Sequence, residues 1–157
     1  MTTTYGMLSQ EAARTRSGLE LMRGIVSGAN PQPPICKPAH FHLHEVSEGS
    51  AVFVGTPTID FYNPIAVVHG GWIATLLDSC ASCAVHTLVK AGYAYTTLEL
   101  KVNFVRPVLE KTGPMRAEGR VIHGGSRTAT AEGRLLDASG KLYAHGSVTC
   151  MIFPISP

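Results

Sequence analysis

A single acidic residue stands in a long uncharged part of the chain, and its surroundings point to chemistry. Between Phe61 and Val89 the only carboxylate is Asp78, and this stretch contains no Lys or Arg. The neighbouring residues follow the pattern of a buried helix, where an unpaired charge is costly. A lone acid in such a helix is a candidate reactive group. The alternative is a carboxylate that faces water or a subunit interface.

The helix that carries Asp78 is expected to begin at two glycines. Gly70 and Gly71 follow His69 and open an apolar stretch that extends to about Ala91. Free N–H groups at a helix N-terminus can hold an oxygen that gains negative charge, and glycine lets a substrate approach the backbone closely. A carboxylate in a dry site can act as nucleophile or general base. The two glycines could equally form a tight turn into the helix.

One narrow polar stripe follows this otherwise apolar helix. Its members recur at helical spacings: Thr75, Asp78, Ser79, Ser82 and His86. Ser82 lies one turn beyond Asp78, within hydrogen-bonding reach. Cys80 and Cys83 have the spacing of redox and metal sites, but they lie well inside the helix and lack a second such pair. We interpret them as small apolar core residues.

Composition restricts the classes of protein to which the chain can belong. With 157 residues, 45% apolar and 15% charged, it is expected to form a globular domain. The net charge of +2 and the lack of a Lys/Arg block argue against nucleic-acid binding. The N-terminus lacks the pattern of a signal peptide, and no apolar run reaches the roughly 20 residues that span a membrane. We therefore expect a cytoplasmic protein with neither a membrane nor a nucleic-acid partner.

The remaining pattern predicts a sheet that surrounds the apolar helix. A further helix is expected from Leu8 to about Gly28, followed by a Pro-rich linker that ends at Pro38. Strands are expected at residues 40–46 and 51–58 before the apolar helix, and at 98–104, 115–123, 128–136 and 142–153 after it. We assign residues 1–38 to the N-terminal helix and linker, and residues 39–157 to the main domain. One apolar helix beside runs of strands predicts an α+β architecture with an antiparallel sheet.

This order of elements, together with three short motifs, resembles the hotdog fold. The motifs are Asn63-Pro64, then His69-Gly70-Gly71 with Asp78 nine residues after the histidine, then Asn103-Phe104-x-Arg106-Pro107. The set resembles the acyl-CoA thioesterases of the phenylacetic-acid-degradation type over roughly residues 40–153. The resemblance implies a hotdog domain with an extra N-terminal helix, and hydrolysis of acyl-CoA by water. It also implies a homodimer or dimer of dimers that uses no metal or other cofactor.

The same resemblance implies roles for individual residues. The expected catalytic residues are Asp78, Gly70, Asn63 and His69, and the expected substrate-binding residues are Gly71, Ser82, Arg106 and Arg127. Asp78 would attack the thioester or activate water, and the Gly70 N–H would polarise the thioester carbonyl. Asn63 and His69 would orient the carbonyl or the water, and Ser82 would support the water. Asn63 also has a turn role before proline, and His69 could be a structural residue at the helix end.

Arginines at strand ends are candidate ligands for the phosphates of coenzyme A. Arg127 is the first choice because it follows Gly124-Gly125-Ser126, where backbone groups could also donate to anions, and Arg106 is the second. Each could instead be a solvated surface charge. Two other functions remain open: a non-catalytic hotdog protein that binds acyl thioesters or only assembles, and an acyl-CoA hydratase or dehydratase. The identity of the acyl group is also left open.

The spacing of the two central candidates predicts a site shared between subunits. Gly70 and Asp78 are eight residues apart, which is about 12 Å along one helix. The oxygen donor and the attacking carboxylate must both lie roughly 3 Å from one thioester group. Two antiparallel helices related by a two-fold axis could meet this condition, with Gly70 of one subunit facing Asp78 of the other.

Overall fold

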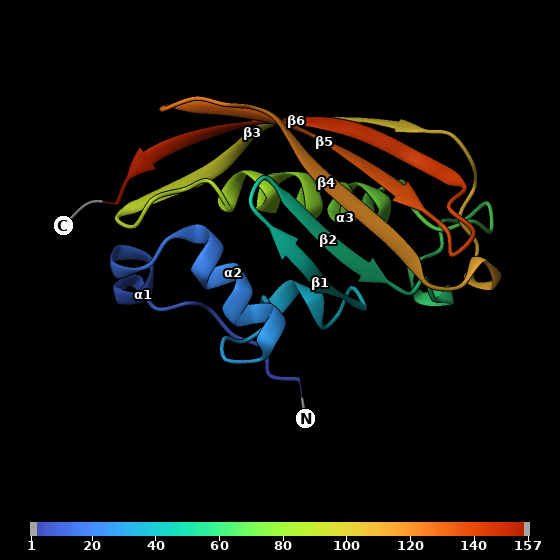
Figure 1. Ribbon diagram of the computed structural model, residues 1–157. Coiled ribbons are helices and arrows are strands. Elements are labelled where there is room, and N and C mark those ends of the chain that lie inside the picture. The colour runs from blue at the N-terminus through green and yellow to red at the C-terminus, as the bar shows by residue number, and fades with distance from the viewer. Residues whose placement is uncertain (1–2, 156–157) are drawn as a thin grey trace.

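The computed structural model describes residues 3–155 and consists of a curved antiparallel sheet wrapped around one long helix (Figure 1). The strands are β1 (Phe41–Ser47), β2 (Ser50–Gly55), β3 (Tyr93–Phe104), β4 (Met115–Gly124), β5 (Thr128–Leu136) and β6 (Leu142–Pro154). They form a six-stranded sheet in the order β1-β2-β4-β5-β6-β3. Helix α3 (Gly70–His86) lies on the concave side of this sheet. The predicted α+β architecture is confirmed.

Two glycines in the sheet allow α3 to lie close against the strands. The inward side of β5 carries small residues at alternate positions, among them Gly133, whose missing side chain leaves room for Leu77 and Cys80 of the helix. At Gly119 of β4, a Cβ atom would collide with the backbone carbonyl of Cys80. The helix is apolar on nearly all sides because the sheet covers most of its circumference.

The N-terminal helix that the sequence predicts is divided into two. Helix α1 (Gln10–Thr15) ends before Ser17, and helix α2 (Gly18–Ser27) begins there. Ser17 has an extended backbone, and its N–H donates to the carboxylate of Glu20 at 2.8 Å, which completes a capping box. The prediction of one continuous helix is therefore wrong, because Ser17 and Glu20 start a new helix in its middle.

Helix α3 is shorter, and the strand after it longer, than expected. The helix ends at His86 rather than near Ala91, and β3 begins at Tyr93 rather than at Leu98. Thr87 terminates the helix, because its hydroxyl donates to the Ala84 carbonyl at 2.6 Å and accepts from the Gly49 N–H at 2.7 Å. A tight turn with Gly49 at φ +74 joins β1 to β2.

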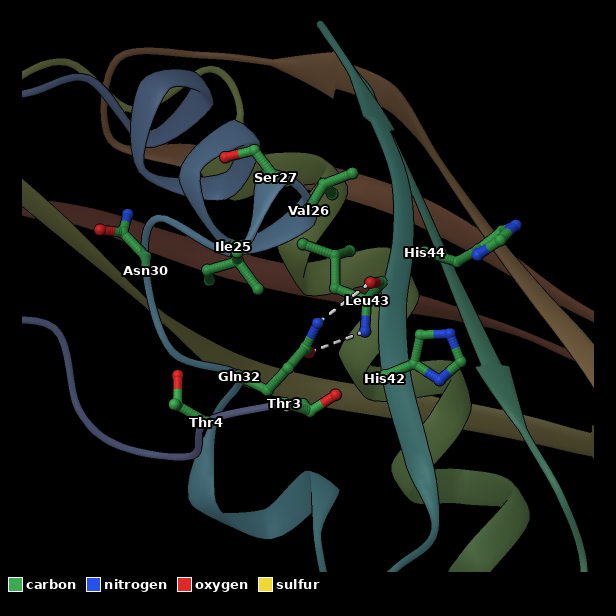
Figure 2. Close-up of a pocket in the computed structure, with 11 residues that line it drawn as sticks. Thr3, Thr4, Ile25, Val26, Ser27, Asn30, Gln32, His42, Leu43 and His44 are labelled. Carbon is green, nitrogen blue, oxygen red and sulfur yellow. Dashed lines mark hydrogen bonds between the residues drawn. The ribbon is translucent and has the colours of Figure 1, made fainter. Parts of the chain in front are cut away.

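The two edges of the sheet differ in how they are protected. At β1, the side-chain amide of Gln32 pairs with the backbone of Leu43, whose N–H donates to Oε1 at 2.9 Å and whose carbonyl accepts from Nε2 at 3.2 Å (Figure 2). Helix α2 lies beside this strand and buries Met22 and Ile25 in the core that also contains Trp72. Within the described residues, no strand covers the outer edge of β3. Phe104 at its end is 57% exposed.

Among residues 3–155, no helix is both long enough and apolar enough to cross a membrane.

Candidate functional site

Asp78 lies in the middle of α3 and faces β3. Its side chain is partly buried, and Oδ1 accepts a hydrogen bond from Oγ1 of Thr97 at 3.0 Å. Thr97 is an inward-facing residue near the middle of β3, and so the strand holds one oxygen of the carboxylate. Thr97 is not among the site residues expected from the sequence. Its position opposite the acid depends on how the strand crosses the helix.

Ser82 takes part in a second polar group one turn further along α3. Its side chain is buried and hydrogen-bonded to the hydroxyl of Tyr95, which also lies 3.8 Å from Sγ of Cys83. Burial holds the pKa of Tyr95 well above its usual range. The ring of His86 lies 4.9 Å from that of Tyr95, and burial lowers the pKa of this histidine to about 4. Ser82 therefore lies one turn from Asp78 on α3, and its own partner on β3 is Tyr95.

Asn63 and Gly70 line one hollow beside the start of α3. The hollow has a volume of about 420 Å³ and is lined by Asn63, Val67, Val68, Gly70, Ile73 and residues 104–108. Gly70 is the first residue of the helix, where a backbone N–H has no acceptor within the helix itself. The oxygen of the Asn63 side chain accepts from the N–H groups of Ile65 and Val67, at 3.1 and 3.3 Å. This leaves the amide nitrogen of Asn63 as the group that can bind a ligand.

His69 and Gly71 lie on another side of the same helix end. Nδ1 of His69 accepts from the Gly71 N–H at 2.8 Å, so this histidine caps the helix. Both residues line a hollow of about 440 Å³ that also contains Phe61 and Trp72, whose rings stack at 5.7 Å. The structure therefore gives His69 a local structural role and separates it from the hollow that contains Asn63 and Gly70.

The two candidate arginines lie at opposite ends of the sheet. Arg106 follows β3, lines the Asn63–Gly70 hollow, and donates from Nη1 to the carbonyl of Leu142. Arg127 precedes β5, and its carbonyl accepts from the N–H of Ile152 at 2.8 Å. The pairing of β6 with β3 runs the length of both strands, so roughly 30 Å separates the two arginines within one subunit. One subunit cannot direct both of them to the same phosphate group.

Of the two cysteines of α3, Cys80 is buried and Cys83 is partly buried. Burial raises the pKa of Cys80, and it raises that of Cys83 to about 12. Within residues 3–155, no three His, Cys, Asp or Glu side chains lie close enough to share a metal ion. The thiols have the environment of core residues rather than of reactive groups.

A family model establishes the relationship of the chain to known proteins. The model of the thioesterase superfamily matches residues 65–144, just over half of the chain. The chain belongs to the thioesterase superfamily. The matched segment includes Gly70, Asp78 and Thr97 but begins after Asn63.

Solved structures of the thioesterase superfamily support the hotdog fold. A phenylacetic acid degradation-related protein from Ralstonia eutropha JMP134 is 27% identical, with a TM-score of 0.75, over 83% of this chain and 98% of its own. Another thioesterase-superfamily protein is 30% identical, with a TM-score of 0.69, over 85% of this chain and 97% of its own. The phenylacetic acid degradation protein of Thermus thermophilus, as an asparagine-to-aspartate variant, is 24% identical, with a TM-score of 0.68. The match covers 75% of this chain and 97% of that protein. This last likeness shows the fold alone. No curated protein matches the chain.

Within this superfamily member, two neighbours of the candidate residues could be identified only from the structure. Thr97 bonds to Asp78, and Phe104 lies against Gly70: a Cβ atom built on this glycine would be 2.9 Å from Cζ of the ring. Both come from β3, which the sequence identified as an alternating strand without showing where it crosses α3. The one signal in the sequence is that Phe104 is a large apolar residue at the end of an alternating strand, and the structure shows it to be exposed there.

Proposed function

We propose that the protein hydrolyses acyl-CoA thioesters to the free acid and coenzyme A. Membership of the thioesterase superfamily supports thioester hydrolysis in general. The observation that carries the proposal is the hollow at the start of α3, whose lining combines the Gly70 N–H and the Asn63 amide nitrogen with Arg106 and mainly apolar side chains. Such a pair suits a thioester carbonyl, whose oxygen gains negative charge as water or a carboxylate attacks the carbon.

Asp78 is the proposed nucleophile or general base. Its Oδ1 is held by Thr97, and so Oδ2 is the oxygen left to attack the thioester or to take a proton from water. Ser82, one turn further along α3, interacts with Tyr95 of β3 and is the proposed hydroxyl that supports the attacking water. His69 caps the helix that presents the Gly70 N–H, which makes it a positioning residue rather than a group in contact with substrate.

The proposed site is shared between two subunits. Within one helix Gly70 and Asp78 are about 12 Å apart, too far to act on one thioester. The open edge of β3 supports pairing with the same strand of a second subunit, because the Gln32 side chain already occupies the backbone of Leu43 at the β1 edge. A two-fold axis across β3 would set two α3 helices antiparallel, with Gly70 of one facing Asp78 of the other. This geometry implies a homodimer, alone or within a dimer of dimers.

The same two-fold axis would bring the two arginines toward one another. Arg106 lies beyond the end of β3, and Arg127 lies near its beginning. In an antiparallel pair of β3 strands, the end of one strand lies beside the beginning of the other. Arg127 of one subunit and Arg106 of the other would then lie at the same end of the joined sheet. Both could contact the phosphates of coenzyme A there.

Release of free thiol from a panel of acyl-CoA esters tests this function. We expect turnover for at least one ester by the wild-type protein, and its loss in Asp78→Asn, which retains the shape of the side chain but cannot act as nucleophile or base. A protein that binds acyl-CoA with no release of thiol would contradict the proposal and favour the alternative of a non-catalytic binding protein. Water added across an enoyl-CoA double bond would instead favour a hydratase.

Mixing of subunits tests whether the site is shared. Asp78→Ala subunits and Gly70→Leu subunits should each be nearly inactive alone. In a mixed dimer one site carries both defects and the other carries none, so random one-to-one reassortment should restore about a quarter of wild-type activity. Exchange is monitored by mass spectrometry of differently tagged subunits. If the subunits exchange without any return of activity, both groups act within one chain.

A further inference from the structure

We infer that Phe104 selects the shape of the acyl group, admitting straight chains and excluding acyl groups that branch next to the carbonyl. The inference rests on the proposed hydrolysis and concerns the hollow at the start of α3. It assigns a specificity role to a side chain that supplies no reacting atom. Its basis is the position of the ring relative to the Gly70 N–H.

The ring of Phe104 lies directly over Gly70. A Cβ atom on Gly70 would be 2.9 Å from Cζ and 3.2 Å from Cε1, so the edge of the ring occupies the space where any other residue would carry its side chain. A carbonyl oxygen bound to the Gly70 N–H therefore lies beside this ring. The carbon atoms attached to that carbonyl must pass the ring before they reach the rest of the hollow.

Apart from Asn63 and Arg106, the side chains that line the hollow with Phe104 are aliphatic. Val68 comes from the loop before α3, Ile73 from the first turn of α3, and Val108 from the segment after β3. Val68 and Val108 are buried, and the N–H of Val68 donates to the carbonyl of Val108 at 3.0 Å, so this wall is fixed. Such a surface suits an unbranched hydrocarbon chain, whose burial is favourable and needs no polar partner.

The hollow on the other side of the helix start has a different character. It is lined by Phe61, Tyr62 and Trp72, with Gly71 and Thr75 of α3. The Gly71 N–H already donates to His69, so this hollow lacks the free donor that Gly70 offers on its own side. For this reason we place the acyl group beside Phe104 rather than among the aromatic rings.

A pair of isomeric substrates isolates branching from size and hydrophobicity. Butyryl-CoA and isobutyryl-CoA contain the same atoms, and only the second carries a methyl branch next to the carbonyl. One misplaced methyl group in an apolar pocket changes kcat/KM by about tenfold or more. We expect the wild-type protein to prefer butyryl-CoA by about tenfold, and Phe104→Ala to lose most of this preference by gaining on the branched ester. Phe104→Leu should fall between the two.

Leu98→Ala is the matched control, because Leu98 lies on the same strand with a similar exposure of 58% but does not line the hollow. It should leave the isomer ratio unchanged. Sedimentation of all variants confirms an unchanged assembly. An unchanged ratio in Phe104→Ala overturns the inference. Thr75→Phe would fill the aromatic hollow. A ratio that changes in Thr75→Phe but not in Phe104→Ala would also overturn the inference, because it would place the acyl group in the aromatic hollow.

Failure of the proposed hydrolysis would look different from failure of this inference. If the wild-type protein releases no thiol from any ester, the hydrolysis is wrong. Calorimetric binding of the same two esters to Asp78→Asn, with and without Phe104→Ala, then tests the selectivity alone. A preference of several-fold for butyryl-CoA that disappears with the ring supports the role of Phe104. Equal dissociation constants for both esters in both proteins would refute it.

Discussion

Replacement of Thr97 by valine tests whether β3 positions the carboxylate of Asp78. The two side chains have nearly the same shape, so the variant should retain its packing against α3 and lose only the hydroxyl. That hydroxyl donates to Oδ1 of Asp78 at 3.0 Å, within the normal range for an O–H to oxygen bond. Without it, the carboxylate can rotate away from the position in which Oδ2 would face the thioester.

The size of the effect follows from the nature of this hydrogen bond. A bond to a charged acceptor contributes about 1.5–3 kcal/mol, which corresponds to roughly tenfold to hundredfold in rate if it acts fully in the transition state. Asp78 is only partly buried, so water can replace the hydroxyl and recover part of this energy. We therefore expect kcat to fall about tenfold, the lower end of this range, with little change in KM because Thr97 does not line the hollow in which we place the acyl group.

The assay is thiol release under steady-state conditions, with thermal unfolding measured in parallel. Thr96→Val is the matched control, because Thr96 is the neighbour of Thr97 on β3 and its side chain is exposed and faces away from α3. It should behave as wild type. Wild-type kcat in a folded Thr97→Val protein would refute the reasoning, because the hydrogen bond would then contribute nothing to the reactive position of Asp78. A selective rise in KM would refute it as well.

Three further predictions concern charge and titration. Arg127→Ala and Arg106→Ala should raise KM for acyl-CoA several-fold with little change in kcat, and less so at high salt, as measured by steady-state kinetics at two salt concentrations. Equal KM values for wild type and both variants would remove the arginines from the substrate site. The double variant of Cys80→Ala and Cys83→Ala should retain activity, at a cost of a few kcal/mol in the free energy of unfolding, because burial raises the pKa of both thiols. Lost turnover in the folded double variant, or stoichiometric zinc in the wild-type protein, would contradict this. Burial lowers the pKa of His86 to about 4, below its value in the unfolded chain, so the neutral side chain stabilises the fold above pH 6.5 and this contribution is lost as the pH falls toward 4. Urea unfolding measures how far the free energy of unfolding decreases between pH 7 and pH 5. This decrease should be about 2 kcal/mol smaller in His86→Gln than in wild type. Equal decreases in the two proteins would contradict the burial of a neutral imidazole.

The order of elements could be predicted from the sequence because periodicity reports local structure. The strand from Leu98 to Phe104 alternates cleanly, and the apolar helix that starts at Gly70 is longer than any strand could be. The predicted ends of the helices were wrong, because side-chain hydrogen bonds determine where a helix begins and ends. Ser17 and Glu20 form a capping box that divides the N-terminal helix, and Thr87 ends α3 through a bond to the distant Gly49. Only the first of these signals is visible in the sequence alone.

The candidate site was harder to predict because its parts come from different elements. The sequence identified Asp78 and Gly70 from their isolation and position on one helix. It could not identify Thr97 or Phe104, since their importance depends on where β3 crosses that helix. It also grouped His69 with Asn63, whereas the hydrogen bond from Gly71 turns the histidine toward a different hollow.

The N-terminal segment bears on the site without contributing a residue to it. It lies outside the part of the chain that matches the superfamily, and its Gln32 covers part of the edge at β1 by pairing with Leu43. The open edge then belongs to β3, the same strand that holds Asp78 through Thr97 and covers Gly70 with Phe104. In the proposed dimer this strand would pair with a second subunit and also position both halves of the site, so assembly and reactivity would be linked. In the proposed enzyme a separated subunit would therefore retain its fold and its Asp78, yet lack an oxygen donor within reach of that carboxylate.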